Sequence, residues 1–374
     1  MTARRVLFVA DSLDVGGAER VLVELAGGLV ARGARVAVAC SVGGALAVQA
    51  EQAGIKVVVL GSTLVKRRVD RDFADALARL IALDAPEVVH SHMYASTAAA
   101  AFAVEGIGVP LVIHEHSEAH WRNKQARRRI ADAYRRCRAV IAVSGPIRQR
   151  LVELDQVAPE KVHVVTNALP ALPPVAEVAM RVALSQCQRG PLVGVVARLE
   201  PEKGVEIFLR AVRLLARRFP AAHFVVVGDG RQRAALENFA AHRGLPVTFL
   251  GFRLDGPALV GQLDLLVVPS FSEGTPLVVL EAAGAGVPVV ATAVGGIPDQ
   301  LRDGIEVLLV PAGDASALAD ACGRIMNDPG LGMQLATAAR HRAEQHYQPH
   351  AALDAVEAIY RSLLDVEAAR SDPS

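Results

Sequence analysis

The sequence predicts an α/β fold with two domains, each built on a parallel sheet that helices cover on both faces. The chain has 374 residues, which is more than one hydrophobic core usually serves. Hydrophobic residues make up 52% and aromatic residues 4% of the chain, a composition typical of Val-rich buried strands under Ala- and Leu-rich helices. Short apolar runs also alternate with helical patterns, which indicates parallel sheets wound on both faces.

The expected strands form two sets. The first half of the chain contains seven, at 6–10, 35–40, 56–60, 88–91, 111–114, 139–143 and 162–165. The second half contains six, at 192–196, 222–227, 247–250, 265–268, 287–291 and 306–310. Between the sets, residues 168–176 carry three prolines, which indicates a linker. We therefore expect one Rossmann-like domain over 1–168, a second over 177–345, and further helices over 346–374.

Charge and cysteine content exclude several classes of function. Lys and Arg (40) nearly balance Asp and Glu (39), so the net charge predicts no nucleic-acid partner. Cys40, Cys137, Cys187 and Cys322 lie far apart, with no CxxC pair and no histidine at metal-ligand spacing. This pattern predicts unpaired, buried thiols in a reducing compartment.

No segment resembles a targeting or membrane-spanning sequence. The chain runs almost at once into an expected strand, which leaves no room for a signal peptide. The most apolar long stretch, 93–113, is interrupted by Glu105, two glycines and Pro110. It predicts a helix followed by a buried strand rather than a bilayer span. We therefore expect a soluble, cytoplasmic protein.

The strongest functional motif follows the expected strand at 265–268. Glu273 lies in a polar loop before a helix that begins near Thr275 and Pro276. Proline is favoured at the first helical position, and the free amides of that turn bind anions. Glu281 lies about five residues into this apolar helix, where a carboxylate is rarely buried without a polar partner. The two carboxylates can hold sugar hydroxyls; alternatively, Glu273 only stabilises the helix dipole and Glu281 is exposed.

Two cations follow the expected strand at 192–196. Arg198 ends that strand and Lys203 opens the next helix, so both point to the same edge of the sheet. They suit a diphosphate, since arginine binds it as a fork and lysine as a point charge. Alternatively, both are surface residues that pair with Glu200 and Glu202.

A third motif, Gly-Asp-Gly at 228–230, forms a tight turn after a strand and is weak by itself. It lies in register with the two preceding motifs and with the Val-Gly-Gly-Ile-Pro segment at 294–298. Together these motifs make residues 190–330 resemble glycosyltransferase family 4, the retaining enzymes of the GT-B fold. The resemblance implies two Rossmann-like domains that face each other across a cleft, with the last helices crossing back to the first domain.

The resemblance also implies a role for each motif. Arg198 and Lys203 would bind the diphosphate of a nucleotide-sugar donor, and Glu281 would bind its ribose. Glu273 would hold the transferred sugar, together with the amides of the helix start. The expected donor site comprises Gly16, Gly17, Arg198, Lys203, Gly228, Asp229, Glu273, Gly274, Thr275, Pro276, Leu277 and Glu281.

The amino-terminal half contributes paired glycines and a histidine. Gly16 and Gly17 precede an expected helix at 21–29, where glycines let a ligand approach the backbone and free amides bind an anion. An ordinary strand–helix turn is the alternative. In the family this loop borders the donor diphosphate, and a histidine in a later loop contacts the donor sugar. His116 fits that position best and His114 is the fallback, unless the histidine is only structural.

The resemblance implies transfer of the donor sugar to an acceptor that the first domain binds. The acceptor would be a glycan or a lipid-linked intermediate, as in polysaccharide or glycoconjugate biosynthesis. His116, Glu273, Arg198 and Lys203 are the expected catalytic residues. We expect no cofactor and no metal, because no Asp-x-Asp motif lies on a plausible loop. A sugar-nucleotide epimerase of the same fold and a non-catalytic binding relative remain as alternatives.

The basic stretch from Arg122 to Arg138 contains eight cations, both ends included, and a single acidic residue, Asp132. Most such runs are solvated helix faces. The alternative is contact with an anionic bilayer, where each cation contributes on the order of 1 kcal/mol. This alternative would place the protein peripherally at the inner membrane surface.

Overall fold

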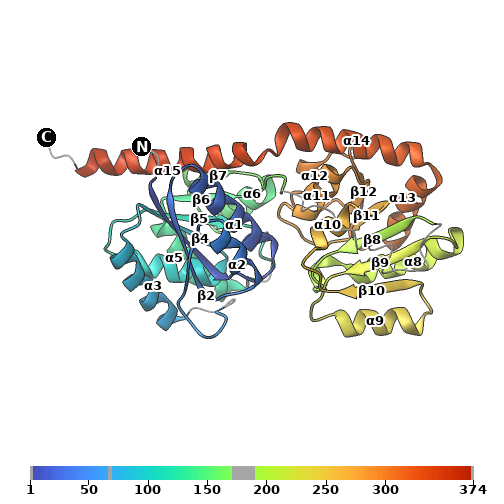
Figure 1. The fold of residues 1–374 in the computed structure, drawn as a ribbon, viewed down its shortest axis with the longest axis horizontal. Helices are drawn as coiled ribbons and strands as arrows, with labels where there is room; N and C mark the ends of the chain where they lie inside the picture. Colours follow the sequence, from blue (N-terminus) through green and yellow to red (C-terminus); the bar gives the residue numbers. More distant parts are fainter. Residues whose placement is uncertain (1–2, 66–69, 121, 171–189, 372–374) are drawn as a thin grey trace. The chain divides into compact units, whose positions relative to one another are not determined.

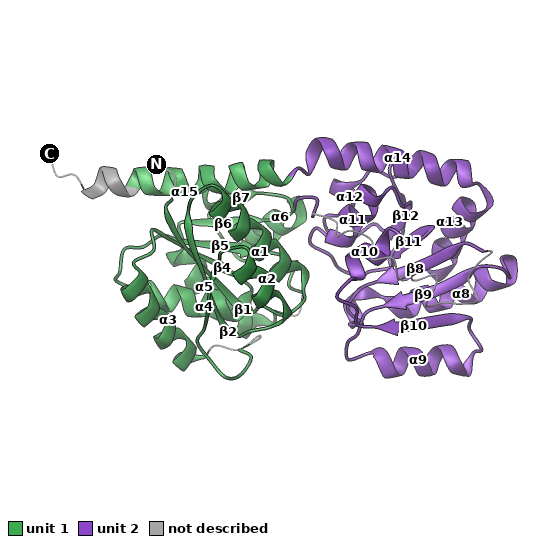
Figure 2. Ribbon diagram, viewed as in Figure 1, with its two compact units in different colours: residues 1–167, 349–374 green, residues 168–348 purple. Residues whose placement is uncertain are grey.

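The computed structural model describes residues 3–65, 70–120, 122–170 and 190–371 (Figure 1). The chain divides into two compact units, which Figure 2 shows in different colours. Unit 1 comprises residues 1–167 and 349–374, and unit 2 comprises residues 168–348. Each unit contains one parallel sheet, so the predicted α/β class with two parallel-sheet domains is confirmed. Residues 171–176 of the expected linker, and Cys187, lie outside the described residues.

Unit 1 is built on a seven-stranded sheet in the order β3-β2-β1-β4-β5-β6-β7. Its strands are β1 (Arg5–Ser12), β2 (Arg35–Val42), β3 (Lys56–Val59), β4 (Val88–His92), β5 (Leu111–Glu115), β6 (Ala139–Ala142) and β7 (Val162–Val164). Its helices are α1 (Gly17–Ala31), α2 (Ala45–Gln52), α3 (Arg71–Asp84), α4 (Tyr94–Ala103), α5 (Lys124–Arg136), α6 (Gly145–Glu153), the 3-10 turn η1 (Pro159–Lys161) and α15 (Pro349–Ser371).

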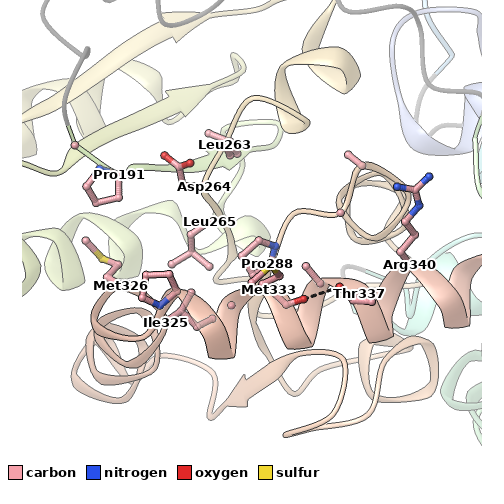
Figure 3. A pocket seen from close by; sticks show the side chains of 16 residues that line it. Pro191, Leu263, Asp264, Leu265, Pro288, Ile325, Met326, Met333, Thr337 and Arg340 are labelled. Atoms are coloured by element: carbon pink, nitrogen blue, oxygen red, sulfur yellow. Dashed lines mark hydrogen bonds between the residues drawn. The ribbon is translucent and has the colours of Figure 1, made fainter.

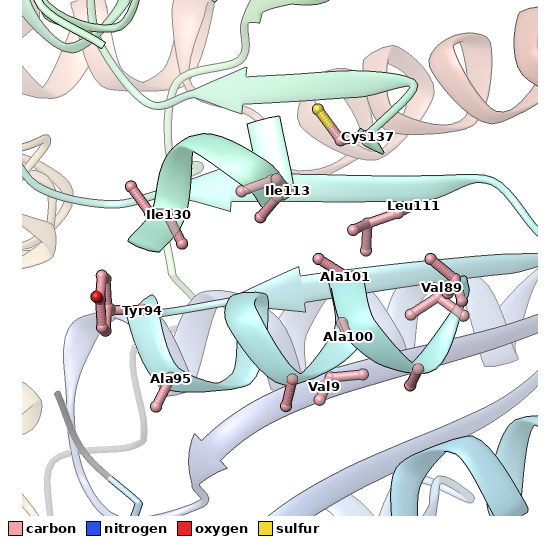
Figure 4. Packing of buried hydrophobic residues seen from close by; sticks show 14 of the residues in the cluster. Val9, Val89, Tyr94, Ala95, Ala100, Ala101, Leu111, Ile113, Ile130 and Cys137 are labelled. Atoms are coloured by element: carbon pink, nitrogen blue, oxygen red, sulfur yellow. The ribbon is translucent and has the colours of Figure 1, made fainter. Parts of the chain in front are cut away.

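The two faces of this sheet are covered by different helices. On one face the Ala-rich helix α4 packs against the strands, with Ala100 and Ala101 near Val89 and Leu111 (Figure 4). Small side chains on a helix that is apolar all round allow this burial. Elsewhere in unit 1, α15 packs on α1 so closely that a Cβ at Gly28 would lie 2.8 Å from a methyl of Leu353. The last helix is therefore part of the core of unit 1.

Unit 2 is built on a six-stranded sheet in the order β10-β9-β8-β11-β12-β13. Its strands are β8 (Leu192–Val196), β9 (His223–Val227), β10 (Val247–Gly251), β11 (Leu265–Val268), β12 (Val289–Thr292) and β13 (Leu308–Val310). Its helices are the 3-10 turn η2 (Pro201–Lys203), α8 (Val205–Arg218), α9 (Arg233–His242), α10 (Gly256–Val260), α11 (Leu277–Ala285), α12 (Ile297–Gln300), α13 (Ala315–Asn327) and α14 (Pro329–His346).

Alternate residues of the central strands in unit 2 enter two separate cores. Leu265 and Val267 of β11 pack in the cluster that contains helices α8 and α13. Leu266 and Val268 pack in the opposite cluster, with α11 and α14. Because successive side chains of a strand point to opposite faces, both faces need apolar residues. This is why the sequence shows a continuous apolar run.

The structure shifts some element boundaries. The strand expected at 287–291 spans Val289–Thr292, because Pro288 has no N–H to donate to the ladder. Helix α1 begins at Gly17 rather than at residue 21, and its first turn carries Glu19, which favours a helix N-terminus. Pro276 is the N-cap of α11 and not its first helical residue, which corrects the expected helix start by about one residue.

Three of the four cysteines lie among the described residues. Cys40, Cys137 and Cys322 are buried free thiols, as predicted. Burial raises the pKa of Cys40 to about 11 and those of Cys137 and Cys322 to about 12. Among the residues that the structure describes, none of the helices combines the length and the apolar character needed to cross a bilayer.

Candidate active site

Four loops of unit 2 meet beyond the carboxyl ends of its strands. They follow β8, β9, β11 and β12 and together carry the motifs that the sequence singled out. Three backbone hydrogen bonds join these loops: Leu199 N to Asp229 O at 2.8 Å, Phe271 N to Glu202 O at 2.8 Å, and Gly296 N to Gly274 O at 2.8 Å. The motifs therefore lie in one connected cluster of loops at the position where open parallel sheets bind ligands.

Two glycines permit the close approach of these loops. Gly204 has φ +61°, and a Cβ there would lie 2.0 Å from the carbonyl oxygen of Pro269. Gly295 has φ +53°, and its Cβ would lie 1.8 Å from the carbonyl oxygen of Glu273. Only glycine combines this conformation with such a contact.

An ion pair lies at the centre of the loop cluster. Lys203 Nζ donates to both carboxylate oxygens of Glu273 at 2.8 Å. The Ser270 hydroxyl donates to Glu273 Oε1 at 2.6 Å, and Ser270 O accepts from the Thr292 hydroxyl at 2.6 Å. Glu273 is 7% exposed, so these donors offset the cost of burying its charge. The structure thus brings together two expected site residues that stand seventy positions apart.

The two cations of this site have different surroundings. The sequence left open whether both pair with neighbouring carboxylates. Lys203 contacts Glu273 instead, and its side chain is 19% exposed. Arg198 lies 3.9 Å from Glu202 and its side chain is 51% exposed. An exposed pair at this distance is weak, so the Arg198 guanidinium is available to an anionic ligand.

The start of α11 directly follows the β11 loop of this cluster and is buried. Thr275, Pro276 and Leu277 are buried, and so is Gly274. Glu281 is the fifth residue of the helix and is 3% exposed. The alternative that Glu281 faces solvent is therefore wrong. A carboxylate one turn into a helix, next to the backbone amides of the helix start, lies where a ligand with hydroxyl and phosphate groups would be held.

The turn after β9 is shaped by its glycines and by Asp229. Gly228 has φ +134°, and a Cβ there would lie 1.8 Å from the carbonyl oxygen of Ala197. The exposed Asp229 carboxylate accepts from the backbone N–H of Gly230 at 2.7 Å and from Arg233 at 2.7 Å. The hydrogen bond from Arg233 lowers the pKa of Asp229. Asp229 therefore stabilises the turn.

In unit 1, the paired glycines begin α1. Gly16 is the N-cap in extended conformation, with φ −158°, so the backbone itself does not require glycine. A Cβ at Gly17 would have no heavy atom within 4 Å, whereas one at Gly16 would meet the Glu19 carboxylate at 2.2 Å. Gly17 therefore borders open space at a helix N-terminus, where an anion can bind, whereas Gly16 leaves room for the Glu19 carboxylate.

The two candidate histidines lie at the end of β5. His114 is inside the strand and buried, and His116 is the first residue after it. They stack with two histidines of β4, His90 and His92, and His116 Nε2 lies 2.8 Å from His92 Nδ1. Burial lowers the pKa of His116 to about 4 and that of His90 to about 3.

His90 and His92 were not among the expected site residues. Residues two apart in a strand share a face, so the spacing His-x-His in an expected strand was a usable signal. The expectation that no histidines have metal-ligand spacing overlooked this pair. The structure brings His90, His92 and His114 together, with one candidate ligand atom from each lying within 4.8 Å of the others.

The basic stretch is not a uniform surface. Arg122 is buried and donates to both oxygens of the Glu115 carboxylate, at 3.0 and 3.1 Å. Arg150 donates to the Glu115 carboxylate at 3.2 Å, and the Tyr134 hydroxyl donates to it at 2.7 Å. Burial alone would raise the pKa of Glu115, but the two arginines and the Tyr134 hydroxyl lower it to about 2. Arg122 thus belongs to a buried network that holds the backbone next to His116, which corrects its assignment to the basic surface.

A pocket of about 910 Å³ in unit 2 lies elsewhere (Figure 3). Pro191, Leu263 and Pro288, which line it, precede β8, β11 and β12. The pocket is therefore at the amino ends of these strands, whereas the loop cluster follows their carboxyl ends. It does not contribute to the candidate active site.

Comparison with known proteins identifies the class. The family model for glycosyltransferase family 4 matches residues 15–170, and the model for glycosyl transferases group 1 matches residues 190–328. Alpha-D-kanosaminyltransferase of Streptomyces kanamyceticus is 31% identical over 297 residues, which cover 74% of this chain and 77% of that protein. D-inositol 3-phosphate glycosyltransferase of Salinispora tropica is 32% identical over 293 residues, which cover 69% of this chain and 60% of that protein.

Solved structures show the same fold. The Anabaena protein HepE, in complex with UDP, superposes with a TM-score of 0.81 at 24% identity, covering 96% of this chain and 100% of that one. Sucrose-phosphate synthase from Thermosynechococcus elongatus gives 0.82 at 22% identity, covering 97% and 100%. The protein is a glycosyltransferase of the GT-B type. It belongs to glycosyltransferase family 4, as its motifs indicated.

Proposed function

We propose that the protein is a retaining glycosyltransferase that moves a sugar from a nucleoside-diphosphate sugar to a hydroxyl acceptor without a metal ion at the donor diphosphate. The Lys203–Glu273 ion pair, beside the start of α11 and the available Arg198, is the observation that carries this proposal. Support also comes from HepE, which was crystallised with UDP and with UDP-glucose. Unit 2 would bind the donor and unit 1 the acceptor.

The donor would rearrange the ion pair. A diphosphate brings negative charge to the loop cluster, and Lys203 would turn from Glu273 to a phosphate oxygen. Arg198 and backbone amides at the start of α11 would bind the same group. Glu273 would then accept hydrogen bonds from hydroxyls of the sugar, while Glu281 would accept from the ribose. Preorganised cations and amides stabilise the charge that develops on the leaving group, which is the task a metal performs in other transferases.

The transfer step exchanges one carbon–oxygen bond for another. The bond between the anomeric carbon and the diphosphate oxygen breaks, and the acceptor oxygen forms its bond on the same face of the ring. The acceptor hydroxyl proton passes to the departing phosphate, so no protein nucleophile is needed. His116 would contact the donor sugar as a neutral imidazole, because burial holds its pKa at about 4. Glu273 positions the sugar.

The acceptor would be a glycan or a lipid-linked intermediate at an anionic bilayer. Six exposed cations remain on or beside α5 after Arg122 is removed from the surface set: Lys124, Arg128, Arg129, Arg135, Arg136 and Arg138. At about 1 kcal/mol each, they would give salt-sensitive binding. Sedimentation with phosphatidylglycerol vesicles tests this contact. Equal binding of the protein to phosphatidylglycerol and phosphatidylcholine vesicles would refute the membrane contact. Equal binding by the parent and by the double variant Arg128→Glu/Arg129→Glu would refute it as well.

A thermal-shift screen of UDP-, GDP- and ADP-sugars in EDTA tests the donor site. A ligand at a hundredfold excess over its Kd adds about 2.7 kcal/mol of stability. We expect one nucleotide class to raise the Tm, and Lys203→Ala and Glu281→Ala to lose the effect. Lys124→Ala, an exposed lysine of unit 1, is the matched control and should keep it. Absence of binding by every nucleotide would refute the proposal and favour a non-catalytic relative.

Product analysis separates transfer from the rival reaction. A transferase releases the nucleoside diphosphate only as fast as sugar appears on an acceptor, apart from slow hydrolysis. A sugar-nucleotide epimerase would convert the sugar and release nucleotide with no acceptor present. Retention is read from the anomeric coupling constant of the product. Stimulation of transfer by Mg²⁺ or Mn²⁺ over the rate in EDTA would contradict the metal-independent donor site.

A further inference from the structure

Three buried histidines of unit 1 lie on one face of two neighbouring strands. His90 and His92 alternate along β4, and His114 is the register partner of His92 on β5. Their ring centroids are 4.7 Å apart for His90 and His92, 4.8 Å for His92 and His114, and 5.3 Å for His90 and His114. All three are at most 3% exposed.

Two of these rings have a hydrogen-bond partner at Nδ1. His90 Nδ1 lies 2.6 Å from the hydroxyl of Tyr360 on α15. His92 Nδ1 lies 2.8 Å from His116 Nε2. If each Nδ1 carries the proton in these contacts, the Nε2 atoms of His90 and His92 each present a lone pair. A histidine that ligates a metal has the same pattern, with one nitrogen bonded to a second group and the other free for the ion.

The opposite ring nitrogens are buried and have no hydrogen-bond partner among the described residues. They are His90 Nε2, His92 Nε2 and both nitrogens of His114. Buried polar atoms are almost always paired, so this cluster is incomplete as a set of protein groups. In this protonation pattern each of the three neutral rings presents one lone pair, and the other nitrogen of His114 carries its hydrogen. A cation satisfies all three lone pairs at once, whereas a single water molecule has only two hydrogens to donate.

We propose that His90, His92 and His114 form a binding site for a divalent transition-metal ion of the zinc type. Three imidazoles are an established zinc donor set, with a solvent molecule in the fourth position. Nitrogen ligands without a carboxylate favour zinc, cobalt, nickel or copper over magnesium and calcium. Burial lowers the pKa of all three imidazoles, which favours the neutral form that ligates metals.

Binding requires the rings to reorient. Ligand atoms of a tetrahedral zinc site lie about 3.4 Å apart for zinc–nitrogen bonds of about 2.05 Å. The candidate atoms lie within 4.8 Å of one another, so rotation of the imidazoles must draw them together. The ion would tie β4 to β5 and, through Tyr360, to α15. Through His92 it would also orient His116, which makes it a positioning element in unit 1 and leaves the donor diphosphate in unit 2 without a metal.

Metal content of the full chain, purified without a polyhistidine tag, tests the proposal. We expect one equivalent of Zn²⁺ per chain after equilibrium dialysis, and a Co²⁺ adduct with the intense visible absorption of a four-coordinate site. His114→Gln should weaken binding at least a hundredfold. His120→Gln changes an exposed histidine outside the cluster and should bind like the parent. Tyr360→Phe removes the partner of His90 and should weaken binding 10- to 100-fold.

Two results would overturn the proposal. One is less than a tenth of an equivalent of Zn²⁺ or Co²⁺ on the parent chain while its circular dichroism shows it folded. The other is equal binding by the parent and by His114→Gln. If His114→Gln does not fold, the Co²⁺ spectrum of the parent decides alone, because nitrogen ligation and an exposed aquo ion absorb differently. Donor binding in the thermal-shift screen is read separately, so failure of the metal site leaves the proposed function untouched.

Discussion

Replacing Glu115 by glutamine should destabilise unit 1 more than any single exposed charge change. The substitution keeps the shape of the side chain but removes the charge that faces Arg122 and Arg150, whose side chains are 3% and 6% exposed. Breaking a buried ion pair by removing one partner costs about 3–5 kcal/mol. The pKa of Glu115, lowered from 4.5 to about 2, gives a similar figure of about 3 kcal/mol at 1.36 kcal/mol per pKa unit.

Urea unfolding followed by the fluorescence of Trp121, the only tryptophan, measures this effect. A loss of about 3 kcal/mol lowers the midpoint by roughly 1 M or more at ordinary m-values. Glu105→Gln is the matched control, because Glu105 also contacts an arginine, Arg136 at 2.7 Å, but is 57% exposed. It should cost less than about 1 kcal/mol. Equal midpoints for Glu115→Gln and Glu105→Gln would refute the reasoning.

The same network predicts that the contribution of Glu115 to the free energy of unfolding depends on pH. The folded-state pKa of Glu115 is lower than its unfolded value, so its contribution is complete above about pH 4.5 and is lost as the pH falls towards 2. The difference in stability between the parent and Glu115→Gln should therefore be constant from pH 7 to 5. It should shrink below pH 4.5. A difference that disappears above pH 5 would assign the effect to another group.

Further predictions concern the donor loop, a helix cap and the thiols. Gly295→Ala places a Cβ against Glu273 O and should weaken nucleotide-sugar binding, measured by calorimetry, at least tenfold. The control is Gly304→Ala: Gly304 also has a positive φ, +70°, but a Cβ added there has no heavy atom within 4 Å, so the affinity should not change. Asp314→Ala removes the acceptor of two first-turn amides of α13 and should lower stability by about 1 kcal/mol; no change in Tm would argue against the cap. At most one of the four thiols should react with Ellman's reagent in the native protein at pH 8, and all four in guanidinium; rapid native reaction of two or more would contradict the burial described.

The strands were the most predictable part of the molecule. Buried parallel strands need apolar residues on both faces, and β11 shows this as the uninterrupted run Leu265–Val268. Such runs are local, so sequence alone reveals them. Boundaries were less accurate because they depend on single hydrogen bonds. At β12 the missing N–H of Pro288 moved the start of the strand, and α1 begins four residues earlier than expected, at Gly17, although glycine disfavours helix.

The sequence predicted which residues gather in the loop cluster but not which of them contact one another. Parallel strands place their carboxyl ends at one edge, so Lys203 and Glu273 were expected near each other. The ion pair itself joins residues 70 positions apart, and its geometry depends on the glycine approach at Gly204. Arg122 is the opposite case. A basic residue in a basic run predicts exposure, and only the fold brings the partner Glu115 to it.

The histidine cluster required knowledge of a still more distant segment. His90 meets Tyr360 across 270 positions, and no local pattern indicates which helix covers that face of the sheet. The spacing of His90 and His92 was visible in the sequence, and the register that brings His114 beside them was not. Pairing register between non-adjacent segments follows from the whole sheet.

The chain path has a consequence for synthesis. Unit 1 includes α15, which follows all of unit 2, residues 168–348. A ribosome must therefore add about 180 residues before Tyr360 and Leu353 exist, which takes roughly 10–40 s at about 5–20 residues per second. During that interval α15 does not yet cover the sheet face that carries His90 or the surface of α1 at Gly28. The first unit to begin folding is the last to be completed.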